Sequence, residues 1–146
     1  MKTYYGDFHI HVGRTKSGKP VKITGARNLT ISTILEYAAT RKGLNMVGVI
    51  DCHVPEVIEE LEGLIASGDM KELNGGGLQH KDGTVLIPGS EIEINDENCH
   101  GPIHVLAYFP TLNKMKQFSE WLRKRVTNNT LSSQRIYENA IVLQET

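Results

Sequence analysis

The sequence has little cysteine and no long apolar run, and each shortage excludes a class of protein. Cys52 and Cys99 are too few for a disulfide framework and lack CxxC spacing, which agrees with a reducing compartment. No apolar stretch is long enough to cross a bilayer. Met1 and Lys2 lead straight into a strand pattern, without the apolar region of a secretory signal. We therefore expect a cytoplasmic protein with no membrane partner.

Familiar catalytic and nucleotide-binding motifs are absent as well. Gly75-Gly76-Gly77 lacks the spacing of a dinucleotide fingerprint and the lysine and serine of a P-loop, so we interpret it as a flexible turn. We find no Ser/His/Asp nucleophile elbow, internal repeat or low-complexity tract. The chain has 146 residues, 39% of them hydrophobic and 23% charged, with a formal net charge of -1. This composition predicts one globular domain of ordinary size.

A metal-binding pattern is present near the start, in residues 4–12 (YYGDFHIHV). Asp7, His9 and His11 occupy alternate positions, and alternate side chains of a strand share a face. One carboxylate and two imidazoles suit zinc, manganese or iron better than calcium or magnesium, which prefer oxygen ligands. The other interpretation is an edge strand with a solvated polar face, and an isolated HxH pattern leaves both interpretations open.

Strand and helix patterns alternate along the rest of the chain. Apolar runs predict further strands at 46–50, 84–87 and 103–109, and residues 95–98 look like a hairpin tip. Helical spacing predicts helices from about Thr30 to Lys42, from Pro55 to Gly68, after Pro110, and from Ser132 or Ser133 through Ile136, Ala140 and Leu143. Residues 69–83 form a polar excursion in which we expect His80 to be exposed. The fold class is therefore α/β, with mostly parallel strands alternating with helices.

More potential ligands follow the predicted strands. Asp51 and His53 come directly after the second strand, Glu91 after the third, and His104 near the start of the next. In α/β folds, ligands from separate strand ends converge on one site. The alternative interpretation is that Asp51 or His53 caps the following helix, and His104 alone would more often be a satisfied core residue. Together these residues indicate a polynuclear metal site in which Glu91 bridges two ions about 3.5 to 4 Å apart.

A basic segment lies beside the proposed metal site. Between Phe8 and Leu35 no acidic residue occurs, and the five basic residues are Arg14, Lys16, Lys19, Lys22 and Arg27. The loop at 13–28 is long for a structureless connection, and such loops are often functional. Its charge suits a phosphate-bearing substrate, although a solvated loop explains the charge equally well.

Four motifs in order resemble the first motifs of the polymerase-and-histidinol-phosphatase (PHP) domain: DFHIH, GVIDCH, PGSEIEI and GPIHVLAYF. The resemblance covers most of residues 4–110. More narrowly, DFHIHVGRTKSGKPVKITGARNL, FPTLNKMKQFSEWL and LSSQRIY are similar to the amino-terminal part of bacterial proteins grouped with endonuclease Q. The resemblance implies a distorted (βα)7 barrel with two or three zinc or manganese ions and cleavage of a phosphodiester at damaged or deaminated DNA bases.

The same resemblance implies roles for individual residues. His9 and His11 would bind the first metal, Glu91 would bridge, and His104 would bind the second. His53 would belong to a third site, with Asp51 beside it, so that Glu91, His53 and Asp51 carry the catalysis. Asp7 moves to an orienting position behind the ligands, and Arg14, Lys16, Lys19 and Arg27 would contact the phosphate or nucleic acid.

The chain also departs from the family pattern. No histidine occurs between His11 and His53, and the later family motifs have no counterpart after His104. We therefore expect residues 1–146 to be one PHP-like domain, the amino-terminal part of a larger barrel. Residues 1–110 would carry the ligand strands, and 111–146 would be helical. A partial barrel leaves open sheet edges and an uncovered apolar helix face, which predicts oligomerisation or poor solubility for this length alone. The missing later ligands predict weak or absent activity.

Three functions follow from these expectations. The first is a metal-dependent phosphoesterase, a DNA endonuclease of the endonuclease Q type. The second is a small-molecule phosphatase of the histidinol-phosphatase kind. The third is a non-catalytic, metal-stabilised scaffold.

Overall fold

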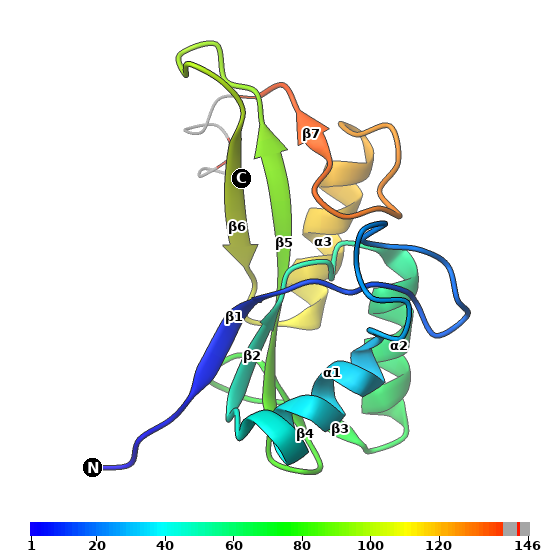
Figure 1. Cartoon of the computed structure of the whole chain (residues 1–146), viewed down its shortest axis with the longest axis vertical. Helices are drawn as coiled ribbons and strands as arrows, with labels where there is room; N and C mark the ends of the chain where they lie inside the picture. Colours follow the sequence, from blue (N-terminus) through cyan, green and yellow to red (C-terminus); the bar gives the residue numbers. More distant parts are fainter. Residues whose placement is uncertain (139–142, 144–146) are drawn as a thin grey trace.

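A computed structural model describes residues 1–138 and residue 143 and shows a mixed α/β fold (Figure 1). In chain order the elements are β1 (Gly6–Ile10), α1 (Ile31–Tyr37) with a π-helical turn (Ala38–Lys42), β2 (Met46–Val49), α2 (Pro55–Ala66), β3 (Met70–Glu72), β4 (Leu78–His80), β5 (Val85–Ile94), β6 (Ile103–Tyr108), α3 (Leu112–Arg123) and β7 (Arg135–Ile136). The predicted α/β class is confirmed.

The long strand β5 is the centre of the sheet, and its two halves have different neighbours. The first half pairs parallel with β2 and antiparallel with β4, in the strand order β1-β2-β5-β4-β3. The pairing with β2 ends at Val49 opposite Pro88. Beyond this point β5 pairs antiparallel with β6 and parallel with β7 (Figure 1). The parallel core β1-β2-β5 brings the carboxyl ends of these strands to one edge.

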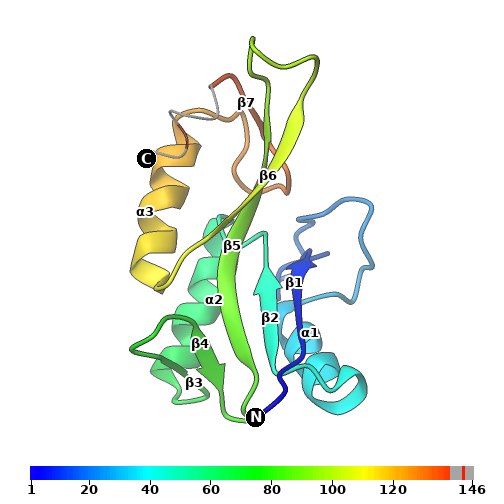
Figure 2. The same cartoon turned by 90° about the vertical axis from the view of Figure 1, so that its left-hand side faces the viewer.

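The helices lie on one side of this sheet, behind it in Figure 2. Their apolar faces meet the sheet in one hydrophobic core, which includes Leu35, Val49, Leu61, Leu86 and Leu122. Phe8 and Tyr108 are exposed large hydrophobic residues, and their rings pack edge to face at 6.3 Å. Helices on one face account for the buried apolar stripe that each helix shows in the sequence.

The predicted helix ends are confirmed by their local geometry. Thr30 caps α1 by accepting a hydrogen bond from the Thr33 amide, and Gly43 ends the helical segment with a left-handed φ of 60°. Pro55 begins α2, where a missing amide donor has no cost. The structure adds a cap that was not predicted, because the Thr111 side chain caps α3 by accepting a hydrogen bond from the Lys114 amide.

The polar excursion at 69–83 contains a short antiparallel hairpin, β3 and β4, that the sequence did not predict. Met70 and Leu78 are buried, but each strand is only three residues long and shows no alternating pattern. Within β4, His80 is only partly exposed, and its Nδ1 lies 2.9 Å from an Asp82 carboxylate oxygen. The prediction that His80 is exposed is therefore wrong.

The predicted carboxyl-terminal helix is wrong over its first part, residues 132–136, although Leu143, the last residue named for it, is helical. Residues 132–134 are irregular, and Arg135–Ile136 form β7, with Ile136 buried opposite Ile94. Ile136 is apolar because it is buried in the sheet, and the same residue also fits the helical spacing that predicted the helix. Ala140, part of the predicted helix, lies outside the described residues.

Two further expectations meet the fold only in part. Over the described residues the strand order runs from β1 to β3 without closing, so the structure shows a mixed sheet and no closed barrel. Among the described helices, none has the length and apolar character needed to span a membrane.

Candidate metal centre

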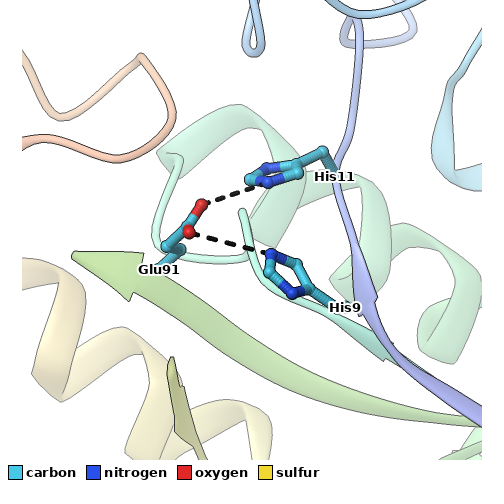
Figure 3. Close-up of side chains that lie close together, drawn as sticks. All are labelled: His9, His11 and Glu91. Atoms are coloured by element: carbon cyan, nitrogen blue, oxygen red, sulfur yellow. Dashed lines mark ion pairs between the residues drawn. The ribbon is translucent and has the colours of Figure 1, made fainter. Parts of the chain in front are cut away.

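His9, His11 and Glu91 converge at the carboxyl edge of the parallel strands (Figure 3). His9 lies in β1 and His11 follows that strand directly, whereas Glu91 lies in β5 just past the end of its pairing with β2. The chain after β2 supports this placement, because the Glu91 amide donates to the Ile50 carbonyl at 2.7 Å. The register of three neighbouring strands therefore brings the side chains together.

The three side chains have the spacing of ligands to one ion. One donor atom from each residue lies within 4.8 Å of the others. His9 Nε2 is 3.7 Å from Glu91 Oε1, and His11 Nε2 is 3.1 Å from Glu91 Oε2. Two ligands of a tetrahedral zinc, each at about 2.0 to 2.1 Å, are separated by roughly 3.4 Å. The residues present therefore fit a divalent ion, although the spacing does not select one metal.

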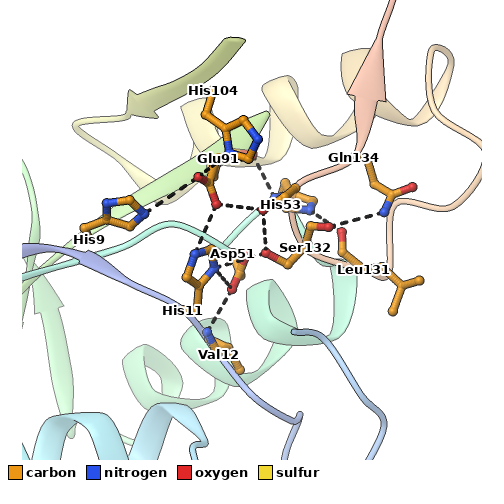
Figure 4. A network of polar contacts seen from close by, with 12 residues as sticks. His9, His11, Val12, Asp51, His53, Glu91, His104, Leu131, Ser132 and Gln134 are labelled. Carbon is orange, nitrogen blue, oxygen red and sulfur yellow. Dashed lines mark hydrogen bonds and ion pairs between the residues drawn. The ribbon is translucent and has the colours of Figure 1, made fainter. Parts of the chain in front are cut away.

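Asp51 orients the His11 ring. Its Oδ2 accepts the Val12 amide at 2.8 Å and lies 3.1 Å from His11 Nδ1 (Figure 4). A proton on Nδ1 shared with Asp51 leaves the lone pair of Nε2 directed at Glu91. Two electron-rich groups in contact need a cation between them, and carboxylate–histidine–metal arrangements supply one. Asp51 Oδ1 is buried without a hydrogen-bond partner among the described residues, so a bound cation nearby would also offset its desolvation.

Glu91 is buried yet favours its charged form. Burial acts to raise the pKa of this carboxyl group. Hydrogen bonds from Ser133 and His104, together with the charge interactions of His11 and His104, lower the pKa by more than burial raises it. The net pKa therefore lies below its usual value. The Ser133 hydroxyl donates to Oε2 at 2.6 Å. A carboxylate that stays ionised while buried is suited to hold a cation.

His104 approaches Glu91 from the other side. Its Nδ1 lies 2.9 Å from Glu91 Oε1, the oxygen that also faces His9. The side chain is 55% exposed, and it is outside the group of three. The predicted neighbourhood of His104 and Glu91 is thus present, and its role at a second ion stays a prediction.

His53 lies deeper than the ligand group and uses both ring nitrogens within the protein. Nδ1 is 2.8 Å from the Ser90 hydroxyl, and Nε2 is 2.9 Å from the Leu131 carbonyl. The carbonyl can only accept, so Nε2 carries the proton and Nδ1 accepts from Ser90. Burial lowers the pKa of His53, with the Leu131 contact and Asp51 acting in the opposite direction. This arrangement favours a neutral His53 that orients its neighbours. Its predicted role as a ligand of a third ion stays a prediction.

Asp7 is exposed, and its Oδ1 accepts a hydrogen bond from the His9 amide at 3.1 Å. The carboxylate that contacts a ligand imidazole is Asp51, so the orienting role predicted for Asp7 falls to Asp51. The register of β1 against β2 shifts between Asp7 and Ile10, which interrupts the regular alternation expected along residues 7–11.

The predicted phosphate-binding residues lie on the loop at 13–28, and the structure does not bring their charges together. Arg14 donates to the Gly18 carbonyl at 2.7 Å, and Lys19 Nζ lies 3.4 Å from a Glu56 carboxylate oxygen of α2. The Lys16 amide donates to Glu60, and Arg27 is exposed. The loop borders a groove that is also lined by acidic residues of α2, including Glu56, Glu59 and Glu60. Contact with a nucleic acid stays a prediction for all four residues.

Three serines of the site were missed from the sequence. Ser90 contacts His53, Ser132 contacts His11, and Ser133 contacts Glu91. Hydroxyl residues carry no spacing signal comparable to an HxH pair, and the segment 132–133 was assigned to a helix. The adjacency of Ser90 to Glu91 was the one usable indication.

Comparison with known proteins gives relatives but no function. The chain is 57% identical to the uncharacterized protein YqxK of Bacillus subtilis over 145 residues, which are 99% of this chain and 37% of YqxK. It is 28% identical to the uncharacterized protein MJ0043 of Methanocaldococcus jannaschii over 118 residues, 81% of this chain and 11% of that protein. No family model and no solved structure matches the chain. The chain thus spans well under two thirds of either relative.

Proposed function

We propose that this protein is a metal-dependent phosphoesterase. The observation that carries the proposal is the convergence of His9, His11 and Glu91, with Asp51 holding the His11 ring. The resemblance of the four motifs to the PHP domain supplies the reaction class. We further propose that the described sheet is the first part of a PHP-type barrel, completed by further sequence in longer relatives such as YqxK.

Each residue has a part in this proposal. His9, His11 and Glu91 hold one ion, and Glu91 with His104 holds a second, which agrees with the contact of both His9 and His104 with Glu91 Oε1. The imidazole and carboxylate donors suit zinc or manganese. A bound ion of this kind lowers the pKa of a water ligand and offsets charge on a phosphoryl group. Asp51 and His53 support the ligand shell from the buried side.

The preferred substrate is DNA, cleaved as by endonuclease Q at damaged or deaminated bases, with Arg14, Lys16, Lys19 and Arg27 as backbone contacts. The second candidate is a small phosphate ester, as in histidinol phosphatases. The contacts of Arg14 with the Gly18 carbonyl and of Lys19 with Glu56 favour this second candidate, because they leave less positive charge free to bind the phosphates of a nucleic-acid backbone.

The test combines metal analysis with hydrolysis of a generic phosphodiester. We expect at least one zinc or manganese per purified chain, and metal-dependent hydrolysis of bis-(4-nitrophenyl) phosphate. His9→Ala should lose both metal and activity. His100→Ala is the matched control, because His100 is an exposed histidine in the loop between β5 and β6.

Three results would discriminate among the functions. Less than one metal per chain contradicts the metal centre. A loaded centre without hydrolysis of mono- or diesters favours the scaffold. Hydrolysis of 4-nitrophenyl phosphate but not of the diester favours the small-molecule phosphatase.

A further inference from the structure

Three consecutive residues, Leu131, Ser132 and Ser133, each contact a different member of the centre. Figure 4 labels the first two of them. The Leu131 carbonyl accepts from His53 Nε2 at 2.9 Å. The Ser132 hydroxyl is 3.1 Å from His11 Nδ1, and the Ser133 hydroxyl donates to Glu91 Oε2 at 2.6 Å. We call residues 131–133 the serine segment. Its contacts reach two of the three proposed ligands from the side opposite β1.

The serine segment is fixed at both ends. The Ser132 amide donates to the Val21 carbonyl at 3.0 Å, which joins the segment to the loop after β1. The Glu93 amide donates to the Gln134 carbonyl at 3.1 Å, and β7 then continues as a parallel neighbour of β5. The segment is therefore a part of the sheet edge that carries Glu91.

Ser133 has an unusual backbone conformation. Its φ is 53°, and within residues 1–138 and 143 it is the one non-glycine residue with positive φ. A side chain in this region is disfavoured, and such residues persist where the surrounding structure requires them. At Ser133 the conformation coincides with the hydroxyl contact to Glu91.

We propose that Ser133 is a positioning residue for the metal ligand Glu91, and that Ser132 has a smaller role of the same kind at His11. The inference rests on the proposed metal centre. The hydroxyl of Ser133 occupies one lone-pair direction of Oε2, which fixes the rotation of the carboxylate about its last bond. Oε1 is then directed at His9 and His104, and Oε2 remains directed at His11.

Ser132 acts at a better-supported ligand. His11 Nδ1 already lies 3.1 Å from Asp51 Oδ2, so the His11 ring keeps an orienting partner when the Ser132 hydroxyl is removed. Glu91 Oε2 has no second hydroxyl partner in the described part of the chain. The effect at Ser133 should therefore exceed the effect at Ser132.

Two substitutions of Ser133 separate positioning from folding. Ser133→Ala removes the hydroxyl and keeps the cost of a side chain at positive φ. Ser133→Gly removes the hydroxyl and also relieves that cost, because glycine adopts positive φ freely. If the role of Ser133 is purely structural, Ser133→Ala should lose metal affinity and Ser133→Gly should keep it. If Ser133 positions Glu91, both variants should lose the same metal affinity.

The experiment is titration of the metal-free chain with Co²⁺, followed by its visible absorption, with Zn²⁺ competition and thermal unfolding in parallel. We expect affinity for Zn²⁺ to fall about 10- to 100-fold in both Ser133 variants, as for other partners that orient metal ligands. The Co²⁺ spectrum should change in both, while Ser133→Gly unfolds at a higher temperature than Ser133→Ala. Ser132→Ala should lose less affinity, and Ser67→Ala, an exposed serine bonded to Leu64 and Asp69, should lose none.

The outcomes separate the two proposals. Wild-type affinity and an unchanged spectrum in both Ser133 variants overturn the positioning role and leave the metal centre intact. Loss of affinity in Ser133→Ala with full recovery in Ser133→Gly also overturns it, because the effect then lies in the backbone. Absence of Co²⁺ and Zn²⁺ binding by the unsubstituted chain overturns the metal centre and, with it, this inference.

Discussion

The metal centre and the basic loop at 13–28 were both expected to handle phosphate, but the structure holds their charged groups in different ways. In the centre, side chains from three strands contact one another, and Glu91 and Asp51 are 4% and 0% exposed. In the loop, Arg14 is bonded to a carbonyl of the same loop, and Lys19 to a carboxylate of α2. Lys16, Lys19 and Arg27 are exposed.

The two regions therefore differ in whether their charged groups have partners of opposite or complementary charge within the chain. The buried carboxylates of the centre face imidazoles, which offer little positive charge when neutral, so a cation is the natural complement. The cations of the loop already have partners at Arg14 and Lys19, and water screens the rest. Surface charge alone is thus weak evidence of a site, whereas the convergence of two histidines on the buried carboxylate of Glu91 is strong evidence.

The largest expected effect is loss of metal from Glu91→Gln. The substitution keeps the shape of the side chain but removes the charge and one acceptor oxygen that face His9, His11 and His104. We expect Zn²⁺ affinity, measured by competition with a chelating dye, to fall by more than the roughly 100-fold loss typical of an outer partner.

Glu93→Gln is the matched control for Glu91→Gln. Glu93 lies two residues further along β5, and its carboxylate pairs with Arg135 instead of the histidines. The affinity of the Glu93→Gln variant for Zn²⁺ should equal that of the unsubstituted chain. Equal losses in both variants would show that general negative charge, and not the centre, retains the metal.

The second prediction concerns the sheet that positions His9. A Cβ on Gly48 of β2 would lie 2.7 Å from Phe8 Cα and 2.9 Å from the Phe8 carbonyl oxygen, so Gly48→Ala must displace β1. We expect a loss of about 1 to 3 kcal/mol in the free energy of unfolding, measured with urea. Metal affinity should fall as well, because His9 moves with β1.

Gly63→Ala provides the control for Gly48→Ala. Gly63 lies within α2, and a Cβ there meets no atom within 4 Å. Alanine is the better helix former, so this variant should gain about 0.5 to 1 kcal/mol. A Gly48→Ala chain that keeps both stability and metal affinity would contradict the dependence of the centre on the strand register.

The third prediction tests the loop directly. Arg27 has no hydrogen bond or ion pair within residues 1–138 and 143, whereas Lys19 is paired with Glu56. If the loop binds a nucleic-acid backbone, Arg27→Gln should reduce the slope of log affinity against log salt by about 1. Lys19→Gln should reduce it by less, because its charge is partly neutralised in the free protein.

Fluorescence anisotropy of a labelled single-stranded oligonucleotide measures these slopes. Lys71→Gln, an exposed lysine on β3, is the control and should leave the slope unchanged. Equal slopes for all variants would remove the loop from the nucleic-acid site and strengthen the case for a small phosphate ester.

Much of the fold and part of the centre could be predicted because the signals are local. The cap at Thr30, the buried run of β2 and the apolar faces of α2 and α3 each follow from a few adjacent residues. The meeting of His9, His11 and Glu91 followed from one further rule, that parallel strands end at the same edge.

What could not be predicted depends on long-range contacts. β7 exists because Ile136 fits opposite Ile94, a pairing that no local pattern shows. The role of Asp51 depends on the backbone of Val12 and the ring of His11, about 40 positions earlier in the chain. The serine segment lies still further from its partners, and a hydroxyl shows its function only through its neighbours.

The smallest expected effect is a difference in thiol reactivity between the two cysteines. Cys52 lies beside the centre, and Cys99 lies in a loop. Cys52 lies between Asp51 and His53, and burial, assisted by Asp51 and opposed by the Gly89 contact, raises the pKa of its thiol to about 12. It should remain protonated and unreactive up to about pH 9, because the thiolate is the reactive form. Exposed Cys99 should react with a chromogenic disulfide at once, giving one fast thiol per chain, and Cys99→Ser should give none. Cys52 should react only as fast as the chain unfolds. A fast reaction of Cys52 that added Zn²⁺ suppresses would instead show that the metal-free centre opens locally, and the contrast between a buried centre and an exposed loop would then hold only for the loaded protein.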